Sequence, residues 1–205
     1  MKVYHQVNGL FSVNTYYVVN ENDNTAVVID GGVKAQKVLD FAREKGIKVT
    51  HMLLTHAHFD HSACSLELQK NGVKVGICER EKDGLKIPAF NLSEYFNIPF
   101  HPTACDFTFT DGEILTINDI DFKVIATPGH SAGSVCFLAE NRLFSGDTLM
   151  FETVGRTDLF GSSATSLVES LRKLKELPDE ISVYPGHGEP TSIKHEKLYN
   201  PFMPL

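Results

Sequence analysis

Four potential metal ligands lie within six residues, in the segment His56-Ala57-His58-Phe59-Asp60-His61. The segment follows the apolar run Met52-Leu53-Leu54-Thr55, which is typical of a strand. In an extended chain, His56 and His58 lie on one side and can bind one ion. Asp60 and His61 then point elsewhere and can bind a second ion. The alternative is a polar, histidine-rich turn without metal.

Three further potential ligands, His130, Asp147 and His187, each follow a short apolar run and a glycine. Glycines let the backbone bend close to an ion, and rigid strand ends hold side chains precisely enough for metal binding. The set now holds five histidines and two aspartates, about what two adjacent ions need when they share one carboxylate. The repeated setting favours a metal site over a polar turn. Three histidines lack that setting and are left out: His5, His51 and His195.

Short β-branched and aromatic runs, separated by turn formers, predict the strands that position these ligands. We expect strands over residues 2–7, 13–19, 25–29, 47–54, 73–77, 113–117, 121–126, 134–139, 142–145 and 181–184. Apolar residues at helical spacing predict helices over 33–45, 62–70 and 163–176, with a short helix or tail at 193–199. The ligands then follow the ends of four strands. No linker divides the chain, so we expect a single α/β domain over 1–205.

The least regular stretch runs from Glu79 to Ala104 and carries many apolar side chains. A segment of this kind either covers a pocket as a lid or packs as a connection against the core, and both alternatives stay open. In the first case, Tyr95 and Phe96 are candidate substrate contacts.

Two other features have plain structural interpretations. Asp30-Gly31-Gly32 ends the expected third strand and is typical of a tight turn, so we do not assign it to a site. Cys64 lies near the histidine motif and is expected to be a small, packed thiol.

Composition narrows the function classes. The net charge of the 205 residues is −7, which argues against a nucleic-acid phosphate backbone as the partner. The four cysteines form no C-x-x-C pair and suit a reduced compartment. The N-terminus lacks the apolar core of a signal peptide, and no apolar stretch is long enough to span a bilayer. We therefore expect a cytoplasmic protein with no membrane partner.

Taken together, the His56–His61 motif, His130, Asp147 and His187 resemble the metallo-β-lactamase superfamily, over essentially the whole chain. The resemblance implies an α/β fold, a four-layer αββα sandwich with the metal site at one edge. It also implies that His56, His58 and His130 hold a first metal. The second would be held by Asp60, His61 and His187, with Asp147 bridging the two.

Within the superfamily, the chain is similar to the short glyoxalase II-like hydrolases, which act on thioesters such as S-lactoylglutathione. The similarity is carried by three stretches: Val154-Gly155-Arg156-Thr157-Asp158, Pro185-Gly186-His187-Gly188 and 196–202. Full-length glyoxalase II enzymes append a helical domain with basic residues for glutathione, and we expect none here. Where those enzymes place a basic residue and, two positions on, a tyrosine, this chain has Arg156 and Asp158.

The implied activity is hydrolysis of a small thioester by two divalent metal ions, with zinc expected and iron or manganese as alternatives. A hydroxide shared by the ions would be the nucleophile. Asp60 is the candidate to orient it and to relay a proton. Arg156 is the candidate contact for a substrate carboxylate, because a guanidinium matches that geometry; a salt bridge with Asp158 is the alternative.

Two other function classes remain open. A persulfide dioxygenase with a single iron is the runner-up, because members of that branch also carry a stretch like Gly155-Arg156-Thr157-Asp158. A nuclease or a non-catalytic binding module comes last. The chain lacks the basic surface of a nuclease, and a binding module would be expected to have lost ligands. The sequence sets no oligomeric state.

Overall fold

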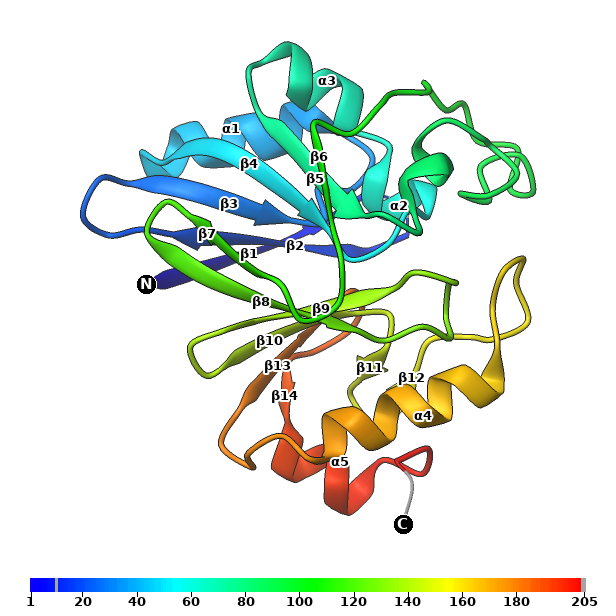
Figure 1. The fold of residues 1–205 in the computed structure, drawn as a ribbon. Helices are drawn as coiled ribbons and strands as arrows, with labels where there is room; N and C mark the ends of the chain where they lie inside the picture. Colours follow the sequence, from blue (N-terminus) through cyan, green and yellow to red (C-terminus); the bar gives the residue numbers. More distant parts are fainter. Residues whose placement is uncertain (10, 204–205) are drawn as a thin grey trace.

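The first six strands form one mixed sheet in the computed structural model, which describes residues 1–9 and 11–203 (Figure 1). In spatial order they are β1 (Lys2–Asn8), β2 (Val13–Val19), β3 (Thr25–Ile29), β4 (Lys48–Leu54), β5 (Lys74–Cys78) and β6 (Phe107–Phe109). The first two pairs are antiparallel, and the pairs from β3 to β6 are parallel. Parallel strands end at the same edge, so the segments after β3 and β4 come together there.

The second sheet has the order β14-β13-β10-β9-β8-β7. Its strands are β7 (Ile114–Ile117), β8 (Ile120–Ala126), β9 (Val135–Ala139), β10 (Arg142–Gly146), β13 (Ser182–Pro185) and β14 (Thr191–Ser192), with a small hairpin of β11 (Leu149–Met150) and β12 (Thr153–Val154). Strand β9 is antiparallel to both β8 and β10, and β13 is parallel to β10. The segments after β8, β10 and β13, which carry the later ligands, therefore leave the sheet at one edge.

Helices cover the outer face of each sheet (Figure 1). Helices α1 (Ala35–Lys45) and α3 (Ser65–Lys70) lie on the first sheet, and α4 (Ala164–Lys175) and α5 (Ile193–Tyr199) lie on the second. The two sheets face each other through a core of large side chains that includes Phe109, Phe122 and Phe137. The fold is thus the expected single-domain αββα sandwich. Among the described residues, no helix is both long and apolar enough to cross a membrane.

Strand β2 shows why a sandwich of this kind needs continuous apolar strands. All seven of its residues are buried. Tyr17 and Val19 pack in the cluster beneath the helices, whereas Tyr16 and Val18 pack between the sheets. Because both faces of the sheet are covered, alternation of apolar and polar residues disappears from such a strand.

The expected helix over 62–70 is wrong in its boundaries. Helix α2 (Phe59–Ser62) begins inside the histidine motif, and α3 begins only at Ser65. Ser62 does not cap a helix, because its Oγ donates a hydrogen bond to the carbonyl oxygen of Ala57, 2.8 Å away. Asp60 and His61 therefore lie on a helical turn and not in an extended chain.

The stretch 79–104 is largely irregular, as expected. It holds the 3₁₀ helix η1 (Lys82–Leu85), followed by a series of turns. Leu85 and Leu92 are buried, whereas the side chain of Tyr95 is 74% exposed. The stretch thus packs against the core in one part and presents aromatic side chains to solvent in another.

Candidate metal centre

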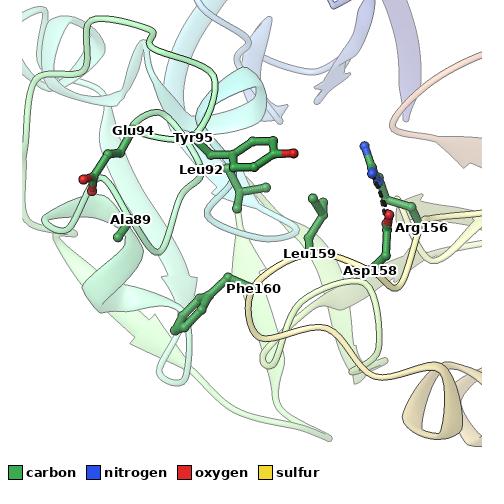
Figure 2. Close-up of a pocket in the computed structure, with 8 residues that line it drawn as sticks. All are labelled: Ala89, Leu92, Glu94, Tyr95, Arg156, Asp158, Leu159 and Phe160. Carbon is green, nitrogen blue, oxygen red and sulfur yellow. Dashed lines mark hydrogen bonds and ion pairs between the residues drawn. The ribbon is translucent and has the colours of Figure 1, made fainter.

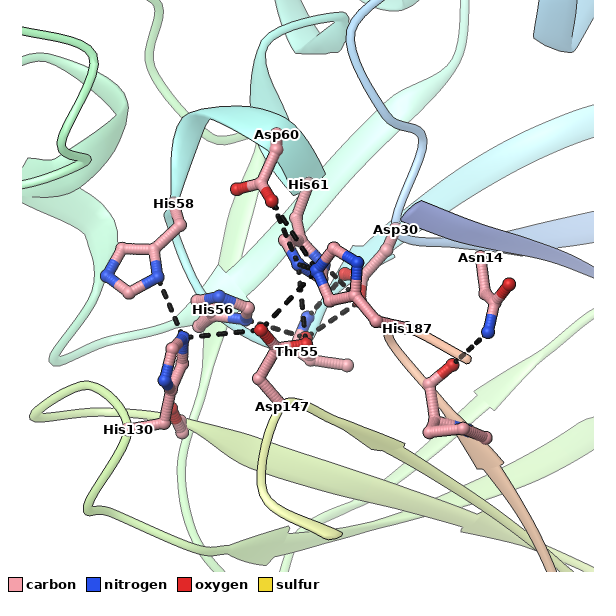
Figure 3. Close-up of polar contacts among 12 residues, drawn as sticks. Asn14, Asp30, Thr55, His56, His58, Asp60, His61, His130, Asp147 and His187 are labelled. Carbon is pink, nitrogen blue, oxygen red and sulfur yellow. Dashed lines mark hydrogen bonds and ion pairs between the residues drawn. The ribbon is translucent and has the colours of Figure 1, made fainter. Parts of the chain in front are cut away.

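All seven sequence-predicted ligands converge where the two sheets end (Figure 3). The ligand atoms form three overlapping groups, and within each group they lie within 4.8 Å of one another. The groups are His56 with His58 and His130, His56 with His61 and Asp147, and Asp60 with His61 and His187. Segments after β4, β8, β10 and β13, together with α2, deliver these side chains.

Asp147 lies between the two outer groups. Its Oδ2 is 3.4 Å from His130 Nε2 and 3.5 Å from His187 Nε2. On the far side of the cluster, His187 Nε2 is 3.5 Å from Asp60 Oδ2. A carboxylate in this place can be shared by two ions, as the sequence predicts.

The cluster has the donor set and the unsatisfied atoms that a cation site requires. His56 Nε2, His58 Nε2 and Asp147 Oδ1 are buried and have no hydrogen-bond partner among the described residues. Buried polar atoms are normally paired, since leaving them unpaired costs about 1–3 kcal/mol each. Imidazole nitrogens and carboxylates suit zinc, and they also suit iron. The residues therefore fit divalent metal ions.

Burial and charge set the protonation of the cluster. Burial lowers the pKa of His56 well below its usual range and that of His58 to about 3. Burial also lowers the pKa of His61, but the carboxylates around it, Asp147 first, outweigh burial and raise it to about 10. At the two aspartates of the cluster, Asp60 and Asp147, burial raises the pKa, and the surrounding histidines lower it further than burial raises it.

Hydrogen bonds fix the orientation of the ligand rings. His130 Nδ1 donates to the backbone oxygen of Arg156, 2.9 Å away, so Nε2 is the unprotonated nitrogen that faces the cluster, where it accepts a hydrogen bond from His58 Nδ1 at 2.9 Å. His61 Nδ1 donates to Asp30 Oδ2 at 2.9 Å. Thr55 Oγ1 donates to the same carboxylate at 2.8 Å and lies 3.0 Å from His56 Nδ1. A hydrogen bond from the ring nitrogen that does not bind the metal holds the ring in one tautomer and makes the other nitrogen a stronger ligand.

Close backbone approach explains why glycines flank the ligands. A Cβ atom at Gly186 would collide with Asp147 Oδ1 and would lie 2.8 Å from His61 Cε1. Gly186 also donates its N–H to the oxygen of Gly146 at 2.7 Å, which ties the β13 end to the β10 end. A side chain at this position would displace the carboxylate between the ligand groups.

Residues 8–187 match the family model described as the metallo-beta-lactamase superfamily. The chain belongs to this superfamily. A probable metallo-hydrolase of Streptococcus pyogenes serotype M6 is 36% identical over 98% of this chain and 90% of that protein. Hydroxyacylglutathione hydrolase GloC of Haemophilus influenzae is 32% identical over 89% of each chain.

Solved structures of the superfamily share the fold closely. The crystal structure of the B3 metallo-beta-lactamase BLEG-1 has a TM-score of 0.94 at 34% identity, covering 98% of this chain and 99% of that one. TTHA1623 in a di-iron-bound form has a TM-score of 0.87 at 30% identity, covering 97% and 99%. ETHE1 from Myxococcus xanthus has a TM-score of 0.83 at 29% identity, covering 98% and 84%.

Two neighbouring cavities lie near this site, and the inner one reaches the ligand cluster. The inner one, of about 390 Å³, is lined by four ligands, by apolar side chains that include Phe96, and by Arg156. The outer one, of about 440 Å³, is lined by Tyr95 and also by Arg156. The three predicted substrate contacts thus lie at the cavities, and their roles stay predictions. The salt bridge between Arg156 and Asp158, which the sequence offered as an alternative, is present.

Two buried carboxylates that support the ligands were not identified from the sequence. Asp30, interpreted as a plain turn residue, accepts hydrogen bonds from His61 and Thr55, so that interpretation was incomplete. Glu81 joins the two halves of the site: its Oε2 accepts from the N–H of Ala57 at 3.0 Å, and its Oε1 accepts from the N–H of Gly133 at 2.7 Å. For Asp30, the available signal was an acidic residue directly after a buried strand.

Proposed function

We propose that this metallo-hydrolase is a thioesterase of the glyoxalase II type, which acts on S-lactoylglutathione or a related small thioester and holds two divalent metal ions, with zinc expected. The observation that carries the proposal is the complete second ligand group, Asp60 with His61 and His187, beside the shared Asp147. Hydrolysis by two Lewis-acidic ions needs that group, whereas a single-iron enzyme does not. The 32% identity to GloC, a hydroxyacylglutathione hydrolase, supports the substrate class.

When bound, the ions would polarise the substrate carbonyl and lower the pKa of a water molecule toward neutrality. His56, His58 and His130 would hold the first ion, and Asp60, His61 and His187 the second, with Asp147 between them.

Asp60 is the proposed proton relay. Its side chain is 16% exposed, and it lines the inner cavity beside His187. The nearby histidines lower its pKa more than burial raises it, so it is ionised and can accept a hydrogen bond from a water molecule and orient it.

The inner cavity would position the acyl group. Phe59, Phe96 and Met150 line it together with the ligands, and they present apolar surface to the reacting end of a substrate. Exclusion of water by such walls strengthens the electrostatic interactions at the carbonyl. The partner is then a small molecule, in keeping with the acidic net charge of −7.

A persulfide dioxygenase with a single iron is the second candidate. Gly155-Arg156-Thr157-Asp158 favours it, because this stretch resembles one that members of that branch carry. The similar TTHA1623 was solved in a di-iron-bound form, which supports iron as a metal for a chain of this fold, although as a pair and not as a single ion. Iron with open coordination positions would be needed for oxygen chemistry.

In the deciding assay, purified protein of known metal content is incubated with S-lactoylglutathione or with glutathione persulfide. Thioester loss and oxygen uptake are measured in parallel. A β-lactam is added as a third substrate, since BLEG-1 is a B3 metallo-beta-lactamase. We expect thioester loss without oxygen uptake. Asp147→Ala should lower turnover at least about a hundredfold, because it removes the carboxylate between the ligand groups.

The control is His195→Ala, which removes a histidine that contacts Glu152 and stacks on Phe151 outside the ligand groups. This variant should keep its activity. Rapid oxygen uptake with one iron per chain, or loss of the β-lactam alone, would overturn the thioesterase assignment.

A further inference from the structure

The two cavities are adjacent and share three lining residues. Because Leu92, Arg156 and Leu159 line both of them, a substrate with its carbonyl at the ligand cluster would extend toward the outer cavity. Figure 2 shows the Tyr95 ring pointing toward the side where Arg156 and Asp158 lie. The charge and polarity of this outer wall therefore decide which substrates fit.

The guanidinium of Arg156 is already paired with Asp158 through its Nε and Nη2. Its Nε lies 2.6 Å from Asp158 Oδ1, and its Nη2 lies 2.7 Å from Asp158 Oδ2. This is the bidentate geometry in which an arginine would hold a substrate carboxylate. A substrate carboxylate must therefore displace Asp158 or lie close to its negative charge.

The charged side chains of the outer cavity are not favourable to anions. Apart from the metal ligands, the described lining residues carry one cation, Arg156, and two acids, Glu94 and Asp158. Their formal sum is −1. An S-acyl glutathione carries two carboxylates and one ammonium, and it would meet like charge along this wall.

The rest of the outer wall is apolar or aromatic. Leu92 and Leu159 form its junction with the inner cavity, and Phe160 and Tyr95 line the outer part. Phe160 stacks on Phe90 with ring centroids 5.2 Å apart, which links the loop after β12 to the irregular stretch. Aromatic and aliphatic walls of this kind bind uncharged groups by burial of apolar surface.

We propose that the preferred substrate is a thioester with no net negative charge on either its acyl arm or its thiol arm. One of these arms lies against Leu92, Leu159 and Phe160. Asp158 disfavours anionic thiol carriers such as glutathione because it occupies the Arg156 guanidinium. The inference rests on the proposed thioesterase function and narrows its substrate class. Asp158 acts here as a specificity residue that works through Arg156.

The test compares S-lactoylglutathione with S-lactoyl-N-acetylcysteamine, which has the same acyl group on an uncharged thiol. For the metal-loaded wild type, we expect kcat/KM to be about three- to tenfold higher for the uncharged thioester, the range for about 1 kcal/mol of surface electrostatics. Asp158→Asn should move this ratio toward glutathione by a similar factor. Because the pair is exposed, the shift should shrink at high salt.

Binding provides a second readout that needs no turnover. Calorimetry with S-benzylglutathione and S-benzyl-N-acetylcysteamine, two thioethers that cannot be hydrolysed, should show the same ratio and the same shift in Asp158→Asn. The matched control is Asp40→Asn, which removes the same charge from another exposed pair, with Arg43 on α1. It should leave both ratios at the wild-type values.

The outcomes separate the two proposals. If neither thioester is hydrolysed, the thioesterase function is wrong, and the thioether affinities still test the charge preference. If both are hydrolysed and the glutathione compounds are equal or better, with no shift in Asp158→Asn, the charge preference is wrong and the thioesterase function stands.

Discussion

Burial and charge act differently on the histidines of the two outer ligand groups. Burial keeps His56 and His58 neutral by lowering their pKa, so their lone pairs are free for an ion at pH 7. The carboxylates around His61 raise its pKa to about 10, so without an ion this ring carries a proton at neutral pH. Asp30 contributes to that effect and also accepts the Nδ1–H bond.

Metal binding at Asp60, His61 and His187 (the His61 group) should therefore release a proton. Metal binding at His56, His58 and His130 (the His56 group) should not. A raised pKa means that the metal competes with a proton up to about pH 10, so affinity at the His61 group should rise with pH between 7 and 9, by up to about tenfold per unit. Zinc calorimetry in buffers of different ionisation enthalpy counts the protons. Asp30→Asn removes a charge that raises the His61 pKa, and it should reduce the release. Equal release by Asp30→Asn and wild type would contradict this account.

At the scale of elements, the irregular stretch 79–104 supplies parts of both cavities. Phe96 packs against Phe11 and Phe59, with ring centroids 5.8 and 5.6 Å away, and lines the inner cavity. Tyr95 lines the outer cavity and is mostly exposed. The N–H of Phe59 donates to the backbone oxygen of Asn91 at 2.9 Å, which ties this part of the stretch to α2.

Phe96→Ala should raise KM by about fivefold, since loss of one partly buried aromatic contact costs about 1 kcal/mol. Tyr95→Ala should raise KM less, because its ring is more exposed. Metal content should stay unchanged in both. The control is Tyr199→Ala, a similarly exposed aromatic on α5. Steady-state kinetics and metal analysis test this prediction. If both variants unfold, and any native fraction keeps a normal KM, then the stretch serves only to pack against the core.

Apolar runs followed by histidine or aspartate made the ligands predictable, because a strand end is a local signal. Strand β2 coincides with the expected 13–19 and β3 with 25–29, since continuous apolar runs between turn formers leave little choice. The start of α2 at Phe59 was not predictable in the same way. It depends on a contact of Ser62 with the turn before it.

The supporting carboxylates show where a single sequence stops being informative. Asp30 meets Thr55 and His61, which are 25 and 31 residues away along the chain. Glu81 meets Gly133, 52 residues away. Both contacts exist only after the sheets have assembled, so local patterns cannot distinguish these residues from ordinary turn or surface acids.

At the scale of the whole molecule, the ligand cluster connects the two halves of the sandwich. His56, His58, Asp60 and His61 follow β4 of the first sheet, whereas His130, Asp147 and His187 follow strands of the second. Bound ions would therefore link the halves, in the same place where Glu81 joins them by hydrogen bonds. Ligands that bind only the folded state stabilise it according to their concentration and affinity.

Removal of the metal should lower the melting temperature of the protein. One ion present at a thousand times its dissociation constant adds about 4 kcal/mol, and about 1 kcal/mol shifts the midpoint by about 2–4 °C for a chain of this size. Calorimetric scans should show the chelated protein melting about 8–16 °C below the loaded one for each ion removed. The difference should shrink in Asp147→Ala, which lacks the carboxylate between the groups, and persist in His195→Ala. Equal midpoints with and without chelator would mean that no ion links the two halves.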